Sequence, residues 1–343
     1  MAKKISLAEI AKSLGVSKTL VSLVINNKAD EHGISAETQQ RVREKIKELN
    51  YHPDELAQGF RTGKTKTIGL IVSDISNLFY SRLARRIEDY AWLNGYTVVI
   101  CSTDEDISKE LEQIRMLRSR KIDGLIVSSS QEDGSFFNKL ADENYPHVLI
   151  DRIFTEMHSP NVSVDNFGGA RMAARHLISQ GMRNFCVISI TPEHISTINE
   201  RLKGFESALN EMGIKIPEEW HIRAPFHQID QAVKEGIQRI YQSAHLPDAI
   251  FTLNNNLTSA TLKYLRKLSV RIPEEVALIG FDDLVYFSYT HPSISVIEQP
   301  IDRIGEKSFE LLLRQIQKEK ILPHEQSIYL PVDIIIRESS IKN

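Results

Sequence analysis

The sequence predicts a small all-α headpiece of three helices, joined to an α/β body of two doubly wound parallel-sheet lobes. Two observations lead to this prediction. Apolar residues recur at helical spacing through the first fifty residues, and from residue 67 short apolar runs alternate with amphipathic helices. We therefore expect a headpiece over 1–53, a hinge helix and linker over 54–66, and a two-lobed body over 67–340.

The stretch that follows Ile5 has the spacing of two short helices joined by a tight turn. Ser6 and Glu9 fit a capping box for the first helix, and Ser17 can cap the second. Gly15 breaks the apolar run where the turn needs a backbone conformation that side chains resist. This spacing is typical of a helix-turn-helix, which lays its second helix in a DNA major groove, although any helical hairpin with a glycine turn shares it.

A third helix is expected to begin after Ser35 and to close the headpiece. Its inward-facing apolar residues are Val42, Ile46 and Leu49. The segment 54–60 is short and contains Gly59, so we expect a marginal helix that folds only when it docks. Residues 61–66 have the composition of a flexible linker.

The body alternates near-continuous apolar strands with helices, a pattern typical of a parallel sheet covered on both faces. One lobe should comprise about 67–162 plus 292–325, and the other about 163–291 plus 326–340. We expect strands over 68–72, 97–101, 124–127, 147–151, 185–190, 249–253 and 276–281, with a short one near 221. Ligands of such sheets bind at the carboxyl ends of the strands, where Ser73, Asp74, Ser128, Asp151, Arg152, Asn254, Asp282 and Asp283 are candidates by position.

The formal net charge of −3 is unevenly distributed along the 343 residues. Residues 1–66 hold 12 Lys and Arg against 8 Asp and Glu, whereas the remainder holds 30 against 37. A basic head on an acidic body suits a small polyanion-binding module attached to another domain. No apolar run has the length of a signal peptide or a membrane span, so we expect a cytoplasmic protein. Cys101 and Cys186 should be inert core cysteines, and no metal-ligand spacing or cofactor motif is found.

Several short phrases follow one another in a characteristic order and spacing. They include Ile10-Ala-Lys-Ser-Leu-Gly-Val-Ser17, Tyr51-x-Pro53, Arg61-Thr-Gly-Lys-Thr65, Asp74-Ile-Ser-Asn77, Asp151-Arg152, Val164-Asp-Asn166, Arg201-x-x-Gly-Phe205 and Gly280-Phe-Asp-Asp283. Through them the chain resembles the LacI/GalR family of bacterial transcription repressors over essentially its whole length. The resemblance implies a DNA-binding headpiece, a hinge helix, and a sensor body like that of the periplasmic binding proteins.

The resemblance also implies which headpiece residues meet the major groove. These are Ser17, Lys18, Thr19 and Ser22. The chain departs from the family pattern at Leu20, where Thr is usual, and at Leu23, where Arg is usual. Without that Arg, a bidentate guanine contact worth ~1–3 kcal/mol is missing, so the operator sequence should differ from those of relatives. Leu20 either touches a thymine methyl group or packs inside the headpiece.

In the hinge, the resemblance implies contacts with the minor groove. Ala57 and Gln58 would lie against the groove floor, and Phe60 would take the place of the family's inserted leucine. An aromatic wedge can unstack a base step and kink the duplex. The alternative is a Phe60 that packs on the body or lies idle in the linker.

In the body, the resemblance implies an effector site between the lobes. Its residues would be Ser73, Asn77, Phe79, Tyr80, Ser128, Asp151, Arg201, Asn254, Asp282 and Gln299. Carboxylate, guanidinium and amide groups beside an aromatic ring suit a polyhydroxylated ligand. The structural alternatives are a helix cap for Asp282, core packing for Phe79 or Tyr80, and a solvated position for Arg201. Asn255 is a further departure, because relatives typically have Asp there.

Together these features predict a homodimeric, sequence-specific repressor of carbohydrate-utilisation genes that binds a pseudo-palindromic operator. A small effector, a sugar or a sugar phosphate, would control it. Alternatives are a nucleobase-type ligand, or a protein corepressor received by Arg82, Arg85 and Arg86. Catalysis is not expected, because no phosphate-binding glycine loop, nucleophile elbow or metal-ligand cluster occurs. A solute-binding protein would leave residues 1–66 unexplained.

Overall fold

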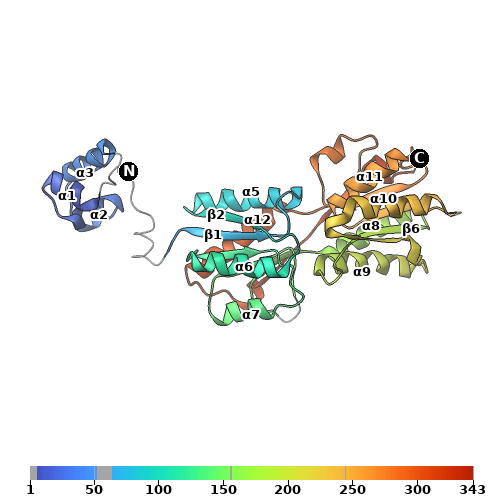
Figure 1. Cartoon of the computed structure of the whole chain (residues 1–343), viewed down its shortest axis with the longest axis horizontal. Helices are drawn as coiled ribbons and strands as arrows, with labels where there is room; N and C mark the ends of the chain where they lie inside the picture. The colour runs from blue at the N-terminus through green and yellow to red at the C-terminus, as the bar shows by residue number, and fades with distance from the viewer. Residues whose placement is uncertain (1–5, 50, 52–63, 155–156, 244, 343) are drawn as a thin grey trace. The chain divides into compact units, whose positions relative to one another are not determined.

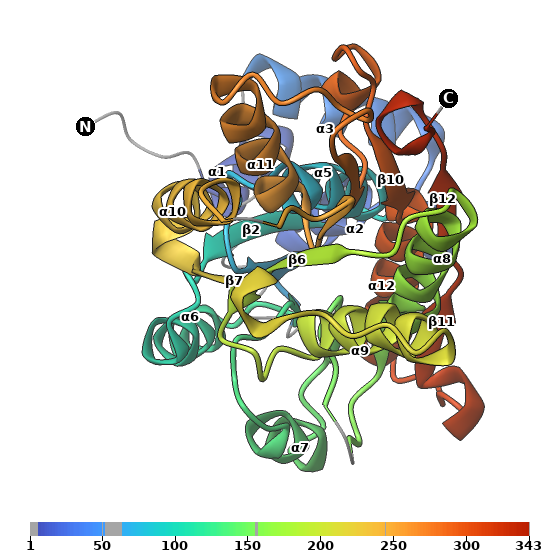
Figure 2. The ribbon, with the colours of Figure 1, turned by 90° about the vertical axis from the view of Figure 1, so that its right-hand side faces the viewer.

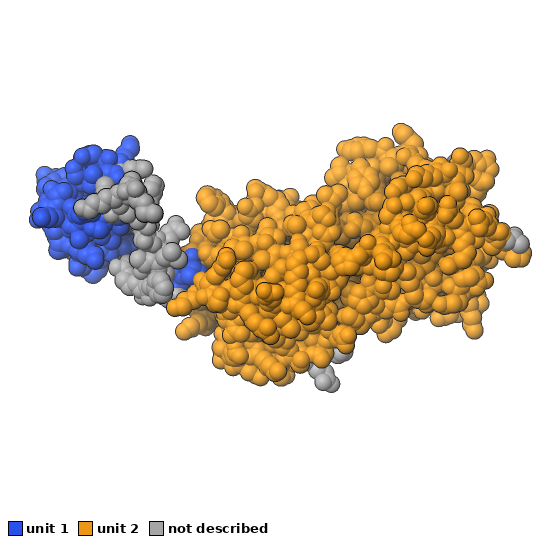
Figure 3. Space-filling view, in the orientation of Figure 1, with its two compact units in different colours: residues 1–65 blue, residues 66–343 orange. Residues whose placement is uncertain are grey.

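A computed structural model describes residues 6–49, 51, 64–154, 157–243 and 245–342 (Figure 1). The chain divides into two compact units, residues 1–65 and 66–343, which Figure 3 colours separately. The hinge predictions for Ala57, Gln58 and Phe60 fall outside the described residues. Within the described part of the chain, no helix is long and apolar enough to cross a membrane.

The headpiece consists of α1 (Leu7–Leu14), α2 (Lys18–Ile25) and α3 (Ala36–Glu48), with the short 3-10 helix η1 (Asp30–His32) before α3. The predicted capping box is present: the Ser6 amide donates to Glu9 Oε2 at 2.7 Å, and the Glu9 amide donates to Ser6 Oγ at 3.3 Å. Ser17 Oγ accepts the Leu20 amide at 3.1 Å and so begins α2. Gly15 has φ 66°, which explains why a glycine stands at the turn.

The headpiece core lies where the three helices meet. Its buried residues include Ile10, Val21, Val24 and Val42. Leu20 is partly buried and packs against this core, in keeping with the packing role considered for it, whereas its contact with a thymine methyl group stays a prediction. Leu23, three residues later, is not among the residues that pack there. The two departures from the family pattern therefore lie in different environments.

Lobe 1 of the body is built on a parallel sheet with strand order β11-β5-β4-β3-β1-β2. Its strands are β1 (Thr67–Val72), β2 (Thr97–Ser102), β3 (Gly124–Val127), β4 (His147–Ile150), β5 (Asn161–Val164) and β11 (Ser327–Leu330). Apolar side chains alternate between the two faces of this sheet. Helices α5 (Leu78–Leu93) and α12 (Ile301–Ile316) pack together on one face, and α6 (Ile107–Ser119) and α7 (Ser135–Asp142) cover the other.

Lobe 2 has the corresponding strand order β12-β10-β9-β8-β6-β7, in which only β12 is antiparallel to its neighbour. The strands are β6 (Phe185–Thr191), β7 (His221–Pro225), β8 (Ala249–Thr252), β9 (Ala277–Phe281), β10 (Ser295–Glu298) and β12 (Asp333–Ile335). Helices α8 (Asn166–Ser179) and α9 (Ser196–Glu211) cover one face, and α10 (Ile229–Tyr241) and α11 (Asn255–Lys267) the other (Figure 2). The short 3-10 helices are η2 (Glu218–Trp220), η3 (Phe226–Gln228), η4 (Val285–Ser288), η5 (Pro323–Glu325) and η6 (Glu338–Ser340).

The chain passes between the lobes after β5, β10 and β11, and two of these crossings differ from the prediction. We expected residues from 292 onward in lobe 1, but β10 pairs with β9 and completes the sheet of lobe 2. We expected residues from 326 onward in lobe 2, but β11 pairs with β5 in lobe 1. Both strands are short, so their own composition does not show whether they belong to the sheet of lobe 1 or of lobe 2. Pairing with a strand far away in the sequence determines it.

The two cysteines also differ in burial. Cys186 is buried in β6, where burial raises the pKa of its thiol. Cys101 is only half-buried, contrary to the expectation of a core position, because β2 is the edge strand of lobe 1. Burial raises the pKa of the Cys101 thiol as well, so both thiols are held protonated and unreactive near neutral pH.

Candidate functional site

A cleft between the two lobes lies at the carboxyl ends of the parallel strands, and its enclosed volume is only about 50 Å³. Nine of the ten predicted effector residues line it: Ser73, Asn77, Phe79, Tyr80, Asp151, Arg201, Asn254, Asp282 and Gln299. Ser128, the tenth, is fully buried beneath the cleft wall and contacts two of the lining residues. The sheet topology thus brings residues from distant parts of the chain to one place.

The wall from lobe 1 is organised around Tyr80 and Asp151. The Tyr80 hydroxyl donates to Asp151 Oδ2 at 2.9 Å and lies 3.0 Å from Ser128 Oγ. Burial raises the pKa of Tyr80, so the phenol stays protonated and holds the carboxylate in one orientation. The ring of Phe79 packs edge-on against Tyr80 at 5.0 Å. The rings of Phe79 and Tyr80 are buried and also line the cleft. Core packing, the alternative considered for them, is therefore compatible with a place in the effector site.

A buried ion pair, Arg152 with Glu105, stands beside this wall. The guanidinium donates to both Glu105 oxygens, at 2.7 and 2.5 Å, and both side chains are less than a tenth exposed. Burial alone would raise the pKa of Glu105, but the Arg152 charge and its hydrogen bonds outweigh burial and lower it. Arg152 Nε is buried without a hydrogen-bond partner in the described structure. This Nε lies 3.8 Å from Asp151 Oδ2, so Arg152 also faces the carboxylate that Tyr80 holds.

Arg201 and Asp282 form the corresponding charged pair on the wall from lobe 2. Arg201 is 3% exposed, which rules out the solvated helix position considered for it. Its guanidinium donates to Asn166 Oδ1 at 2.8 Å and to the Leu253 carbonyl at 2.7 Å, and it stacks 3.7 Å from the centre of the Phe281 ring. These contacts fix the group 3.9 Å from Asp282 Oδ2.

Asp282 accepts a hydrogen bond from Gln299 Nε2 at 2.5 Å. Burial is the main cause that raises the pKa of its carboxyl above the usual range, and the charge of Asp151 adds to it. Arg201 and Gln299 oppose this rise without cancelling it. The side chain is held toward the cleft and does not serve as the cap of η4, whose N-cap position is Leu284.

A hydrogen bond between two amide side chains connects the two lobes beside the cleft. Asn77 caps α5 by accepting the Phe79 amide at 3.0 Å, which fixes its carbonyl oxygen. Asn255 Nδ2 donates to that same oxygen at 2.8 Å from the other lobe. Asn254 caps α11 by accepting the Leu257 amide at 2.9 Å. Asn255, the residue that departs from the family pattern, thus makes a contact for which a donor is required.

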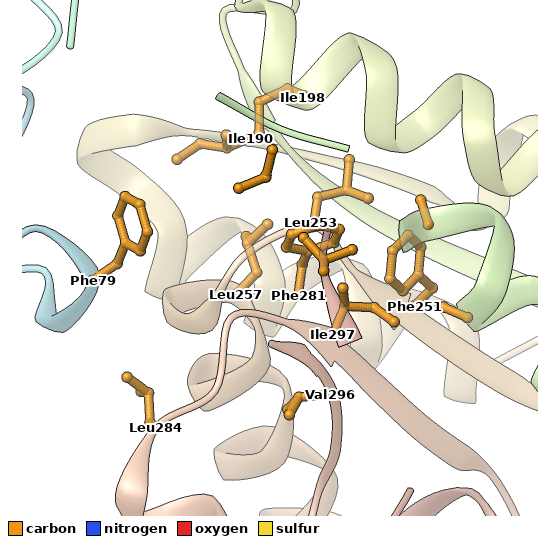
Figure 4. Packing of buried hydrophobic residues seen from close by; sticks show 14 of the residues in the cluster. Phe79, Ile190, Ile198, Phe251, Leu253, Leu257, Phe281, Leu284, Val296 and Ile297 are labelled. Atoms are coloured by element: carbon orange, nitrogen blue, oxygen red, sulfur yellow. The ribbon is translucent and has the colours of Figure 1, made fainter. Parts of the chain in front are cut away.

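The prediction missed several lining residues. Glu105, Ile190, Thr197, Ile198, Phe226 and Asn256 also line the cleft, as does Arg152, which was a candidate by position only. Figure 4 shows Ile190 and Ile198 of lobe 2 opposite the ring of Phe79 from lobe 1. Phe226 directly follows β7, so the rule that ligands bind at strand ends could have identified it.

In the headpiece, the predicted major-groove residues lie around the start of α2. Lys18 and Thr19 are exposed, and Ser22 is half-buried. Ser17 is engaged as the N-cap of α2. A shallow concavity on this face is lined by Leu7, Lys18, Thr19, Ser22, Leu23, Asn26 and Lys28.

The arginines considered for a protein corepressor have intramolecular partners. Arg85 pairs with Glu88 at 2.9 Å and with Asp89 at 2.7 Å, and Arg86 pairs with Asp302. Arg82 donates to the Asp283 carbonyl at 3.2 Å. No group of three or more His, Cys, Asp or Glu side chains among the described residues is arranged to hold a metal ion.

Comparison with known proteins supplies two matching family models. One, described as bacterial regulatory proteins of the lacI family, matches residues 6–54. The other, described as a periplasmic binding protein-like domain, matches residues 174–340. The ribose operon repressor of Halalkalibacterium halodurans is 33% identical over 98% of this chain and 97% of its own. The HTH-type transcriptional repressor PurR of Photobacterium profundum is 30% identical over 97% of this chain and 98% of its own.

Solved structures agree with these relatives. A lac repressor dimer bound to operator and the anti-inducer ONPF matches with a TM-score of 0.88 at 20% identity, over 99% of this chain and all of that one. A periplasmic binding protein/LacI transcriptional regulator from Alkaliphilus metalliredigens, complexed with D-xylulofuranose, matches with a TM-score of 0.70 at 32% identity, over 81% of this chain and all of that one.

Proposed function

The chain belongs to the lacI family of bacterial regulatory proteins, and we propose that it represses carbohydrate-utilisation genes under the control of a small neutral sugar bound in the cleft. As a member of this family it is a DNA-binding transcription repressor and not an enzyme. The proposal concerns the effector and the regulated genes.

The observation that carries the proposal is the pairing of charges in the cleft. Three carboxylates, of Glu105, Asp151 and Asp282, line it together with the guanidinium groups of Arg152 and Arg201. Each guanidinium already faces a carboxylate. A phosphate group would need cationic donors without such a partner, whereas sugar hydroxyls can donate to the carboxylates and accept from the guanidiniums.

The apolar part of the cleft supports the same ligand class. Phe79 and Phe226 line it from different lobes, and Ile190 and Ile198 add aliphatic surface. A sugar ring has one or two weakly polar faces that pack on such rings while its hydroxyl edge meets the charged groups. A relative named for the ribose operon and a structural neighbour complexed with D-xylulofuranose both support a sugar of the size of a pentose as the effector.

Two other classes of effector, a nucleobase-type ligand and a protein corepressor, are distinguished from a sugar by the experiment described below. A nucleobase-type ligand is favoured by the relatives named PurR. A protein corepressor is disfavoured by the partners of Arg85 and Arg86 on the surface of α5.

We further propose that two copies join through their bodies. Large apolar side chains are exposed on lobe 1 at Trp92 (80%) and Leu93 (78%), and on lobe 2 at Tyr289 (75%). Exposed apolar surface of this kind is typical of an interface. The bound sugar would change the closure of the two lobes, rearrange this interface and so alter the placing of the headpieces on the operator.

The deciding experiment is a thermal-shift screen of the full chain against pentoses, hexoses, their phosphates and purine bases. A ligand at 100 times its Kd adds ~2.7 kcal/mol of stability, so a specific sugar should raise Tm clearly. Isothermal titration and operator binding would then be measured for the wild type, Arg201→Ala and the surface control Arg85→Ala.

We expect an unphosphorylated sugar to bind the wild type and Arg85→Ala, to lose binding in Arg201→Ala, and to change operator affinity. Stabilisation by sugar phosphates alone would show that the charge argument is wrong, and stabilisation by purines alone would assign a nucleobase effector. Equal sugar affinity in all three proteins would place the site elsewhere.

A further inference from the structure

One apolar side chain lies on the outer face of the recognition helix α2. Successive residues of a helix are rotated by about 100°, so the side opposite the buried Val21 and Val24 presents Thr19, Leu23 and Asn26. Leu23 is partly exposed and does not pack against the headpiece core, unlike Leu20. An aliphatic group is therefore presented on the face that the family turns to DNA.

Leu23 helps to line a shallow concavity on this face of the headpiece. Leu7 from the start of α1 and Thr19 from α2 line the same concavity, and so do Lys18 and Lys28. The Asn26 amide donates to the Ser22 carbonyl at 2.6 Å and lies 3.3 Å from Ser22 Oγ. The Asn26 amide nitrogen is thus engaged with Ser22, one turn earlier on the same helix.

The concavity selects among the groups that the major groove displays. Guanine offers two acceptors, which need a donor that Leu23 cannot supply, whereas thymine offers a C5-methyl group that apolar side chains contact. The two lysines suit the phosphates on either side of that base. A concavity lined by two leucines and two lysines fits a methyl group carried on a polyanion better than it fits an apolar protein segment.

We propose that Leu23, with Leu7 and the methyl group of Thr19, forms a pocket for the C5-methyl group of one thymine in each operator half-site. Leu23 is then a specificity-determining residue, and thymine occupies the position where an arginine would select guanine. The inference rests on the operator binding that belongs to the proposed function, and it goes beyond it by naming the base and the atom that are read.

The size of the effect follows from the burial of a single methyl group. Such burial changes affinity by about fourfold, and a dimer that reads two half-sites should show about the square of that factor. Replacing thymine by deoxyuridine removes only the methyl group and leaves base pairing and hydrogen-bonding groups intact. The substitution therefore isolates the contact.

The experiment begins by selecting operators from a random duplex pool with the full-length protein. Each thymine of the selected site is then replaced by deoxyuridine, symmetrically in both half-sites, and Kd is measured at fixed salt. The variants are Leu23→Ala, Leu23→Arg and Lys28→Ala, the last as a control that changes charge in the concavity.

For the wild type we expect one thymine whose replacement weakens binding by about tenfold or more in the symmetric site. In Leu23→Ala this penalty should vanish, in Leu23→Arg the preferred base should change to guanine, and in Lys28→Ala the thymine-to-uracil ratio should persist while all affinities fall. Equal penalties at every thymine in wild type and Leu23→Ala would overturn this inference alone. A pool that yields no enriched sequence would contradict operator binding itself.

Discussion

Asp151 and Asp282 occupy equivalent places in the two lobes. Each directly follows a strand, β4 or β9, and these strands hold the same place in the two strand orders. Both residues have a left-handed backbone, with φ 63° and 74°, a conformation that Asp tolerates better than most residues. The charge of Asp151 also contributes to the raised pKa of Asp282, so each lobe turns one carboxylate toward the same space.

The raised pKa of Asp282 predicts opposite pH dependences for ligand binding and for the stability of the ligand-free protein. Burial disfavours the ionised carboxyl, so the folded state binds a proton more tightly than the unfolded state, whose Asp pKa is about 3.9. The stability that this group contributes is full below that value and is lost as pH rises through the folded pKa.

Sugar hydroxyls donate to the ionised carboxylate, so sugar affinity should rise over the same interval of pH. Isothermal titration and thermal unfolding across acidic to neutral pH would measure both trends. Asp282→Asn should flatten each of them relative to wild type. If sugar affinity and Tm depend on pH in the same way in both proteins, ionisation of Asp282 does not control sugar binding.

The second prediction is that breaking the ion pair between Arg152 and Glu105 allows the cleft to bind an anion. Glu105→Gln keeps the shape of the side chain but leaves the buried guanidinium with Asp151 alone, whose Oδ2 lies 3.8 Å from Arg152 Nε, so the body should be destabilised by at most about 3–5 kcal/mol. The same change frees Arg152 to bind an anion. Sulfate or inorganic phosphate should then raise the Tm of Glu105→Gln but not that of the wild type.

The exposed pair of Arg118 and Glu143 provides the matched control, because Glu143→Gln should cost ~0–1 kcal/mol and create no anion site. Equal responses of wild type and Glu105→Gln to phosphate would mean that the wild-type cleft already accepts anions. The argument for a neutral sugar would then fail.

The third prediction concerns the hydrogen bond between Asn255 and Asn77, which joins the two lobes. Asn255 Nδ2 donates to Asn77 Oδ1, and the orientation of that oxygen is fixed by its role as the cap of α5. Asn77 Oδ1 also accepts the Phe79 amide, so an Asp at position 255 would place a carboxylate against an acceptor. Asn255→Asp should therefore weaken the closed arrangement of the lobes, lower sugar affinity severalfold and also lower Tm, because position 255 is fully buried and a carboxylate there has no donor to replace the lost one. Asn210→Asp, at an exposed position of α9 that does not line the cleft, is the control. Unchanged affinity in Asn255→Asp would show that the bridge between the lobes carries no binding energy.

The sequence predicted those parts of the fold that local patterns determine. The capping box of Ser6 and Glu9 and the turn at Gly15 depend on residues close together in the chain, and the strands predicted between 67 and 281 match observed strands closely. The short strand β5 (Asn161–Val164) was not predicted. The lobe membership of β10 and β11 was not predictable in this way, because it depends on pairing with strands far away in the sequence.

The same distinction holds for the cleft. Asp151 and Asp282 directly follow strands, so the rule for parallel sheets located them without any knowledge of packing. Glu105 lies three residues beyond the end of β2, in a loop whose path is set by its contact with Arg152. The apolar residue Ile198 reaches the cleft from α9, a helix whose approach depends on its packing against α8. Residues placed by loops and helix packing therefore escaped the prediction.

Gly204 connects that helix packing to the site. A Cβ atom on Gly204 would lie 2.1 Å from the Phe167 carbonyl oxygen of α8, so only glycine permits the two helices to approach this closely. The atom it would meet is backbone and cannot rotate away. Arg201 lies one turn earlier on the same helix, and its contacts with Asn166 and Leu253 depend on where α9 lies.

Gly204→Ala should therefore destabilise the body by about 1–3 kcal/mol and displace Arg201 from the cleft. We expect a lower Tm and a loss of sugar affinity larger than the loss of stability alone would produce. Thermal unfolding and titration of folded protein would measure both, with Asn210→Ala on the exposed side of α9 as the control that changes neither. A Gly204→Ala protein with lowered Tm but wild-type sugar affinity would show that Arg201 does not depend on the close approach of α8 and α9. Unchanged Tm would contradict the close approach itself.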